Sequence, residues 1–182
     1  MKDNVILTYS IFDTAFGLCG IAGTERGIIR LVLPGMTEDE IILRLCSGQV
    51  SAISHQPSDV SRGKFREIEK SVRRYFTGER GDFDFPLDLS HCTDFQRKVY
   101  KVTRNIHYGE VKTYKWIAER LKMPDAARAV GNALSRNPIP LIIPCHRVIR
   151  GDGRMGGFTA PGGIDLKMRI LKMEKGIYPD NA

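Results

Sequence analysis

The fold of this chain is restricted most by three closely spaced prolines, Pro138, Pro140 and Pro144. A residue that precedes proline is pushed out of the helical conformation, and asparagine readily adopts turn conformations. The helical pattern before this segment must therefore end at Asn137. We expect the prolines to hold the following chain on an extended path. That path leads directly to an adjacent cysteine and histidine, Cys145 and His146.

The pair formed by Cys145 and His146 allows two interpretations. In an extended segment neighbouring side chains point to opposite faces, so His146 is poorly placed to take the proton of Cys145 directly, and a bridging water or a local bend is needed. For such pairs in general, a buried cysteine beside a hydrogen-bonded structural histidine is the commoner situation. Here the prolines before the pair and a glycine-rich loop after it favour chemistry at the thiol. The loop glycines are Gly151, Gly153, Gly156 and Gly157.

Charge is distributed unevenly along the 182 residues. Residues 1–90 contain 11 basic and 13 acidic side chains, whereas residues 91–182 contain 17 basic and 8 acidic ones. Lysines that merely keep a small domain soluble are a common explanation, but a shift of this size favours a nucleic-acid surface in the second half. We therefore expect two domains, residues 1–90 and 91–182.

Composition and motifs argue against several classes of protein. No segment approaches the roughly 18 apolar residues of a membrane span, and the first residues lack the apolar core of a signal peptide. We expect no membrane partner and a cytoplasmic location, or a nuclear one in a eukaryote. The four cysteines are far apart and are expected to be reduced thiols, and no phosphate-binding motif indicates a cofactor. We also expect no metal, because short-range spacing is missing among the conceivable ligands Cys19, Cys46, His55, His91 and Cys92.

The first domain has the pattern of a small α+β unit. Three apolar, β-branched runs predict strands, at residues 5–12, 16–23 and 27–34. The segment from Thr24 to Gly27 predicts a turn, and Thr37 with Glu40 forms a capping box at the start of a short helix. A second helix is expected around residues 64–78. Its apolar stripe consists of Phe65, Ile68, Val72, Tyr75 and Phe76.

The second domain has the pattern of a series of short helices. Thr93 and Gln96 form a capping box for an amphipathic helix that we expect to run to Gly109. Thr113 caps the next helix, which is expected to end before a break at residues 122–124.

A further helix is expected to begin at Asp125 and to run to Arg136. Two helices of this length separated by a short turn are typical of a helix-turn-helix, although an ordinary helical hairpin fits the pattern equally well. Arg128 favours the first interpretation because small neighbours let a helix approach a nucleic-acid backbone closely. Those neighbours are Ala126, Ala127, Ala129 and Gly131.

The sequence PCHRV at residues 144–148, preceded by RAVG at 128–131 and NP at 137–138, resembles the O6-alkylguanine-DNA alkyltransferases. The resemblance runs from about Phe95 to Gly176. It implies an α+β protein with an RNase H-like first domain and a mainly helical, winged-helix-like second domain that binds DNA and carries the site. It also implies direct-reversal repair by a monomer that needs no cofactor. Such a protein flips O6-alkylguanine out of double-stranded DNA and transfers the alkyl group irreversibly to its own cysteine, once per molecule.

The resemblance also implies roles for single residues. Cys145 is the alkyl acceptor, made more thiolate-like through a water by His146, which Glu174 on the last helix orients. Tyr114 hydrogen-bonds the flipped guanine and helps to neutralise the leaving base. Arg128 takes the place of the flipped nucleotide in the base stack. Further implied positions are DNA contacts at Thr113, Ala129 and Gly131, a hinge at Asn137, and a guanine pocket at Pro140, Val148, Phe158 and Thr159.

This chain departs from the family pattern at Phe158, where tyrosine is common, so a hydroxyl contact is lost and the stacking surface is kept. Thr159 replaces what is often serine, a mild change if the backbone N–H makes the contact. Without the resemblance, Glu174 reads as a solvated surface charge. Two other functions are considered: a non-catalytic lesion-binding protein of the same shape, against which Cys145 argues, and a Cys-His hydrolase, which the adjacency of the two residues disfavours.

Overall fold

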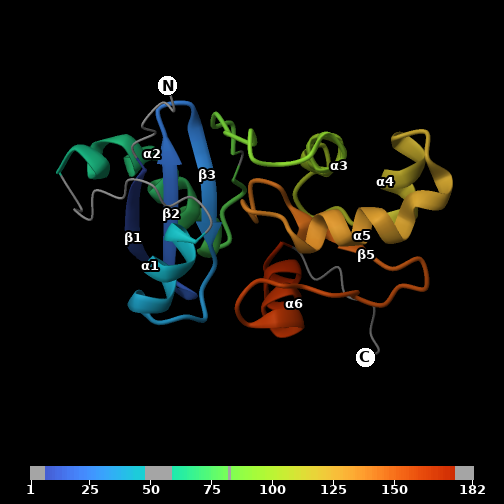
Figure 1. The fold of residues 1–182 in the computed structure, drawn as a ribbon. Coiled ribbons are helices and arrows are strands. Elements are labelled where there is room, and N and C mark those ends of the chain that lie inside the picture. Colours follow the sequence, from blue (N-terminus) through green and yellow to red (C-terminus); the bar gives the residue numbers. More distant parts are fainter. Residues whose placement is uncertain (1–6, 48–58, 82, 175–182) are drawn as a thin grey trace, which may run out of the picture. The chain divides into compact units, whose positions relative to one another are not determined.

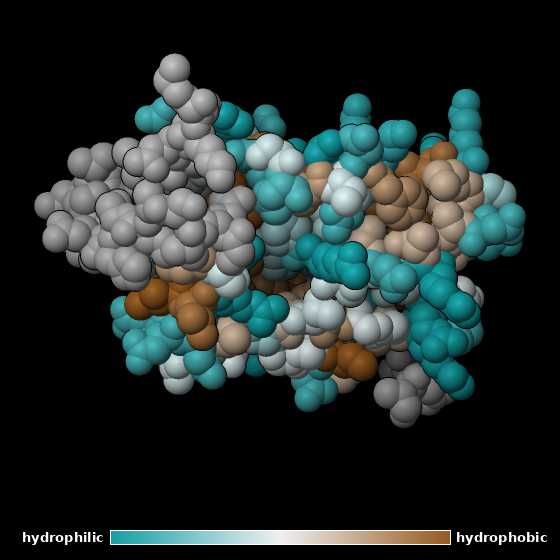
Figure 2. Space-filling view, viewed as in Figure 1, coloured by the Kyte–Doolittle hydropathy of each residue, from teal (hydrophilic) through white to brown (hydrophobic). Residues whose placement is uncertain are grey.

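The computed structural model describes residues 7–47, 59–81 and 83–174. The chain forms two compact units, Met1–Leu89 and Ser90–Ala182 (Figure 1). Hydrophilic side chains are spread over the visible surface of both units (Figure 2). Among the described helices, none has the length and apolar character needed to cross a membrane.

The first unit is built on an antiparallel sheet in the order β1-β2-β3. The strands are β1 (Thr8–Thr14), β2 (Gly17–Thr24) and β3 (Gly27–Val32). Gly17 and Gly27 have φ angles of 119° and 141°, and only glycine adopts such angles readily in the tight turns that begin β2 and β3. The predicted strands and the turn before Gly27 are confirmed, except that residues 5 and 6 lie outside the described part.

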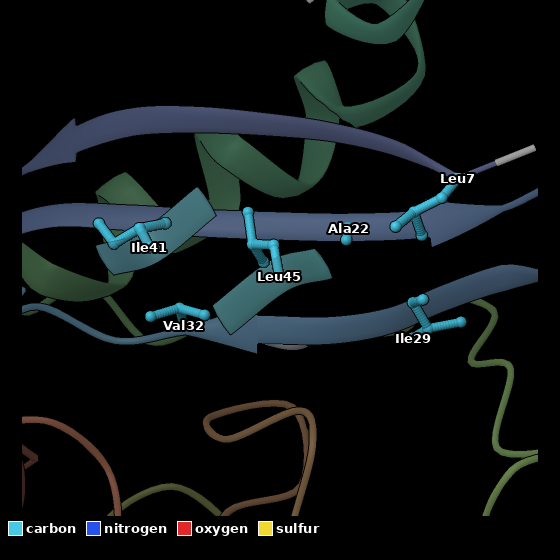
Figure 3. Packing of buried hydrophobic residues seen from close by; sticks show 6 residues of the cluster. All are labelled: Leu7, Ala22, Ile29, Val32, Ile41 and Leu45. Atoms are coloured by element: carbon cyan, nitrogen blue, oxygen red, sulfur yellow. The ribbon is translucent and has the colours of Figure 1, made fainter. Parts of the chain in front are cut away.

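Two helices cover the two faces of this sheet. Helix α1 (Glu38–Cys46) begins with the predicted capping box of Thr37 and Glu40. A Cβ placed on Gly20 of β2 would lie 2.3 Å from the Cγ2 atom of Ile41, so α1 packs directly on the strand backbone. Figure 3 shows Ile41 and Leu45 lying against the face of the sheet, together with Leu7, Ala22, Ile29 and Val32.

Helix α2 (Asp59–Phe76) lies against the other face of β2, where a Cβ on Gly23 would approach the Phe65 ring to 3.2 Å. Because both faces of β2 are covered, its sequence is a continuous apolar run and does not alternate between apolar and polar residues. The predicted stripe of this helix is buried, with each of its five side chains at most 2% exposed. Gly78 has φ 87° just past the helix, as its predicted role as a stop requires.

The second unit opens with α3 (Asp94–Arg104), which has the predicted capping box of Thr93 and Gln96. The prediction that this helix runs to Gly109 is wrong. The helix ends at Asn105, whose N–H donates to the Val102 carbonyl at 3.2 Å, and the chain then turns to bury Ile106. Gly109 instead occupies a later turn with φ 77°.

The next two helices are α4 (Tyr114–Arg120) and α5 (Ala127–Ser135), joined through the 3-10 turn η1 (Pro124–Ala126). The Thr113 hydroxyl accepts the Trp116 N–H at 3.0 Å, which confirms the predicted cap. The expectation that Asp125 begins α5 is wrong, because Pro124 starts the 3-10 turn and no side chain caps α5. Proline fits this first position since it has no N–H to leave unbonded.

The remaining elements bring the N-terminus of α4 beside the cysteine segment. Strands β4 (Lys112–Thr113) and β5 (Val148–Ile149) pair in parallel, with Thr113 opposite Ile149. The 3-10 turn η2 (Cys145–Arg147) immediately precedes β5, and the chain ends its described part with α6 (Gly163–Met173) and Glu174.

Candidate functional site

Helix α5 presents the residues predicted to contact DNA. Arg128 and Ala129 are exposed near its first turn, whereas Val130 and Ala133 are buried on its opposite side. Gly131 is half-buried, and a Cβ placed on it would lie 3.7 Å from the Tyr114 ring. The exposed side of α5 therefore carries one long cation among small or short polar side chains, and the inner side of the helix packs on α4 and α3.

The segment between α5 and Cys145 is folded, so the prediction of an extended path is wrong. Leu141 has φ 70°, and the Ile143 N–H donates to the Ile139 carbonyl at 2.9 Å, which closes a tight turn. The Asn137 side chain holds this turn from inside. Its Oδ1 accepts the Ile139 N–H at 3.0 Å, and its Nδ2 donates to the Ile143 carbonyl at 2.8 Å.

Cys145 lies on the turn η2, partly exposed, at the end of this segment. Asn137 Nδ2 also donates to its Sγ atom at 3.1 Å, so one amide joins the end of α5 to the thiol. Burial raises the pKa of the Cys145 thiol, while the Asn137 hydrogen bond and the charge on Lys167 act in the opposite direction. The thiolate is therefore costly at rest, and two groups are already placed to stabilise it once it forms.

His146 follows Cys145 on the same 3-10 turn, and its side chain is buried within the unit. Its ring is fully buried, and Nε2 lies 3.1 Å from Oε1 of Glu174. Glu174 is itself 0% exposed, at the C-cap of α6, so it is not the solvated charge that its sequence surroundings indicated.

The Glu174 carboxylate also binds Arg147, which the sequence analysis did not single out. Arg147 Nε donates to Oε2 at 3.0 Å and Nη2 donates to Oε1 at 2.7 Å, the bidentate geometry of a strong ion pair. Arg147 is 6% exposed, and its Nη1 donates to the Ile106 carbonyl at 2.8 Å. The Gly109 N–H completes the shell of Glu174 at 3.3 Å.

These contacts fix the protonation states of the cluster. Burial alone would raise the pKa of Glu174, but its hydrogen bond with His146 and its hydrogen bonds and charge pairing with Arg147 hold that pKa well below its usual range. Burial lowers the pKa of His146, against the pull of Glu174. His146 is therefore neutral near pH 7, Arg147 is the counter-charge of Glu174, and the His146 Nε2–H donates to the carboxylate. In that tautomer Nδ1 is the proton-accepting nitrogen.

A second residue that the sequence analysis missed is Lys167 of α6. Its side chain is fully buried, and its ammonium donates to the Val148 carbonyl at 2.7 Å and to the Met155 carbonyl at 2.5 Å. Burial lowers its pKa to about 8, partly opposed by the charge at Cys145. Lys167 thus ties the two ends of the loop after η2 together and places a cation near the thiol.

Tyr114, the first residue of α4, lies close enough to Cys145 to be affected by its charge. Its hydroxyl packs so closely on Gly156 that a Cβ there would approach it to 2.7 Å. Burial and the charge at Cys145 raise the pKa of Tyr114, and the charge on Arg150 opposes them. At neutral pH the hydroxyl is protonated and can donate a hydrogen bond.

The predicted pocket residues Pro140, Val148, Phe158 and Thr159 differ in their burial. Pro140 and Val148 are buried, and Phe158 is half-buried. The Val148 N–H donates to the Cys145 carbonyl, so its backbone is already engaged on both sides. Thr159 is exposed, and its hydroxyl donates to the Ser135 carbonyl at 2.7 Å, a bond that joins the loop to the end of α5.

No three metal-binding side chains come together among the residues that the structure describes. His55, one conceivable ligand, lies outside the described residues. None of the four cysteines, all of which are described, forms a disulfide.

Comparison with known proteins gives a consistent result for both units. The family described as 6-O-methylguanine DNA methyltransferase, DNA binding domain, matches residues 94–176, and the ribonuclease-like domain of the same family matches residues 7–89. The methylated-DNA–protein-cysteine methyltransferase of Methanosarcina barkeri is 39% identical over 170 residues, covering 92% of this chain and 96% of that protein. The protein of the same name from Sulfolobus acidocaldarius is 36% identical over 93% of this chain and 94% of its own length.

Among solved structures, Mycobacterium tuberculosis OGT in complex with DNA is similar with a TM-score of 0.75 and 35% sequence identity. The similarity covers 95% of this chain and 96% of that one. Both domain descriptions of one family therefore match, and the relatives are covered nearly end to end. This chain belongs to the 6-O-methylguanine DNA methyltransferase family.

Proposed function

We propose that this protein repairs DNA by direct reversal, taking the alkyl group from O6 of guanine and keeping it on Sγ of Cys145. One observation carries the proposal. In a chain of this family, the Cys145 thiol held by Asn137 is followed along the chain by His146 and Arg147, which are buried together with Glu174 in one cluster. Burying charged groups costs free energy, so such groups are often found where they have a function. Activation of the neighbouring thiol is such a function.

The reaction is a displacement at the alkyl carbon. The Cys145 sulfur forms a bond to that carbon, the bond from carbon to O6 breaks, and its electron pair leaves with the guanine. A hydrogen bond from the Tyr114 hydroxyl helps to neutralise the departing base. The thioether that forms is not readily hydrolysed, so each molecule reacts once.

The proton of Cys145 leaves toward His146. Because Nε2 of His146 is engaged by Glu174, the path runs through Nδ1 and needs a water between the ring and the thiol. The lowered pKa of His146 keeps this nitrogen able to accept a proton near pH 7. Glu174 then stabilises the imidazolium, and Arg147 keeps Glu174 ionised throughout.

The proposed substrate is a nucleotide flipped out of double-stranded DNA, because a cysteine cannot reach a base inside the stack. Arg128, exposed near the start of α5, occupies the vacated position in the stack. The small residues Ala129 and Gly131 let α5 approach the backbone, and Thr113 lies at the adjacent N-terminus of α4. Asn137 transmits the position of α5 to the thiol through its two side-chain bonds.

The guanine pocket is proposed to lie between Tyr114 and the loop after β5, with Pro140 and Phe158 as apolar walls. The carbonyls of Cys145 and Val148, each of which can accept a second hydrogen bond, and the backbone of Thr159 would supply its polar contacts. We further propose that residues 1–90 and 91–182 are separate domains, that the protein acts as a monomer, and that it works in the cytoplasm, or in the nucleus of a eukaryote.

Neither alternative function is supported as well. A non-catalytic lesion-binding protein has no use for the acceptor thiol that Cys145 provides. A Cys-His hydrolase is disfavoured because the adjacent residues Cys145 and His146 do not easily form a direct dyad, and because it leaves the part of the chain that matches a DNA binding domain without a use.

The test is the stoichiometry of repair. The protein is mixed with increasing amounts of a duplex oligonucleotide that carries O6-methylguanine, and the restored guanine is counted. We expect the product to saturate at one equivalent of protein, and the Cys145→Ser variant to give none. Product beyond one equivalent, or unchanged repair by the serine variant, would overturn the proposal.

A further inference from the structure

The loop that follows β5 is held in shape by its own backbone and one carboxylate. The Arg150 N–H donates to the Arg154 carbonyl at 2.9 Å, and the Gly153 N–H donates to the Arg150 carbonyl at 3.1 Å. Asp152 Oδ1 accepts the Arg154 N–H at 3.1 Å, and its Oδ2 lies 3.0 Å from Arg150 Nη2. The loop therefore presents the Arg150 guanidinium in a defined place, held by Asp152.

This guanidinium lies beside the proposed guanine pocket. Thr113 pairs with Ile149 at the ends of the two short strands, so Tyr114 and Arg150 are the residues that directly follow the paired positions. The charge on Arg150 acts on the Tyr114 hydroxyl, and Gly156 at the far end of the loop packs against the same hydroxyl. The surface over this loop is hydrophilic (Figures 1 and 2).

The ion pair that holds Arg150 is weak enough to be exchanged. The side chains of Arg150 and Asp152 are 55% and 43% exposed, and exposed pairs contribute at most about 1 kcal/mol. A phosphodiester offers a guanidinium the same two-oxygen geometry as a carboxylate, with a charge that is already part of the DNA partner. A DNA strand whose nucleotide enters the pocket must bring a phosphate close to the Arg150–Asp152 pair beside that pocket.

We propose that Arg150 binds the DNA phosphate next to the flipped nucleotide, and that Asp152 occupies its guanidinium until DNA replaces it. The proposal rests on the proposed function, and it adds a phosphate contact on the loop after β5 to the surface of α5. Asp152 acts in two ways: it holds Arg150 in position, and it competes with DNA for it.

The test measures the salt dependence of binding to a duplex that contains O6-methylguanine, in a Cys145→Ser background so that no transfer occurs. Each phosphate contact contributes a slope of about 0.9 to log K against log salt. Raising the salt from about 50 to about 200 mM should therefore weaken the parent about threefold more than Arg150→Gln. Arg150→Lys, which keeps the charge, should retain the parent slope. Arg154→Gln is the matched control, since it removes the same charge from the same loop and should change the slope less.

The competing role of Asp152 gives a second readout. Asp152→Asn should tighten binding by up to about fivefold, the strength of the exposed pair that it removes. The gain should vanish when Arg150→Gln is also present. A gain in affinity that persists in the double variant would show only general repulsion between Asp152 and DNA. Equal salt slopes for Arg150→Gln and Arg154→Gln would show only general attraction between the loop and DNA. Either result would overturn the assignment.

Repair of the same duplex by the wild-type protein separates this proposal from the proposed function. If the wild type repairs the lesion and Arg150→Gln keeps the parent slope, only the phosphate contact is refuted. If the wild type transfers no alkyl group, both proposals fail.

Discussion

Replacing Glu174 by glutamine should affect stability and alkyl transfer for different reasons. The carboxylate is 0% exposed and receives two donors from Arg147, one from His146 and one from the Gly109 backbone. Glutamine keeps the shape but leaves the Arg147 guanidinium buried at 6% exposure with no negative charge beside it. Removing one partner of a buried pair typically costs about 3–5 kcal/mol. We expect the free energy of unfolding at pH 7 to fall by that amount in urea denaturation.

The pH dependence of this loss has a defined sign. The pKa of Glu174 is lower in the folded protein than its ordinary value of 4.5, so its contribution to stability is complete above about pH 4.5 and is lost as the pH falls below it. The difference between wild type and Glu174→Gln should therefore be constant from pH 7 to about pH 5 and shrink at lower pH. A difference that grows on acidification would refute this reasoning.

A second substitution separates the structural role of Glu174 from its proposed role in proton transfer. Arg147→Met in the Glu174→Gln background removes the uncompensated charge, and replacing a buried pair by apolar groups is often neutral for stability. We expect the double variant to regain more than half of the lost stability and to remain slow in alkyl transfer, by roughly 10²- to 10⁴-fold. A loss below about 1 kcal/mol in the single variant would contradict the ion-pair account. Full recovery of the transfer rate in the double variant would contradict the proton path through His146.

Three further predictions address single groups around the thiol. Between about pH 8 and 10.5, the free energy of unfolding of the wild type should rise by about 3 kcal/mol relative to that of Lys167→Met, because the folded protein loses the lysine proton at a lower pH than the unfolded chain. A difference between the two proteins in urea denaturation that does not change with pH would contradict this. Arg128→Ala should slow repair of O6-methylguanine in a duplex much more than transfer from free O6-benzylguanine, which needs no flipping; equal slowing would remove Arg128 from the base stack. Asn137→Ala should raise the pKa of Cys145, seen as a shift to higher pH in its alkylation by iodoacetamide, and an unshifted profile would show that the 3.1 Å contact does not act on the thiolate.

Local signals in the sequence predicted the starts of the three capped helices, α1, α3 and α4, correctly because capping is a short-range interaction. Thr37, Thr93 and Thr113 each accept a backbone N–H from the residue three positions ahead, so the residues that decide the structure are all visible in one short window. Helix ends were harder to predict. Gly109 fits a stop signal, but burial of Ile106 by distant residues ends α3 at Asn105 first.

The path into Cys145 was mispredicted for a similar reason. Proline excludes the helix, but it does not choose between an extended chain and a turn. The choice is made by the Asn137 side chain, which binds Ile139 and Ile143 at once, and by the left-handed backbone of Leu141. Neither could be inferred from proline spacing.

The charged cluster was only partly visible in the sequence. Lys167 and Glu174 look like ordinary helix-surface charges, yet they share the periodic positions of the buried Leu166, Ile170 and Leu171. Charged residues on the apolar stripe of a helix are a usable signal of buried ionic groups. The signal cannot name the partners of Glu174, because His146 and Arg147 approach from a segment more than 25 residues away.

The mass of the peptide that contains Cys145 tests the central claim most directly. Cleavage by trypsin after Arg136 and Arg147 releases residues 137–147, which contain Cys145 and none of the other three cysteines. After the protein is mixed with a duplex carrying O6-methylguanine, we expect this peptide alone to gain one methyl group, in an amount equal to the guanine restored. Restored guanine with an unmodified 137–147 peptide, or a methyl group on the peptides of Cys19, Cys46 or Cys92, would contradict the account.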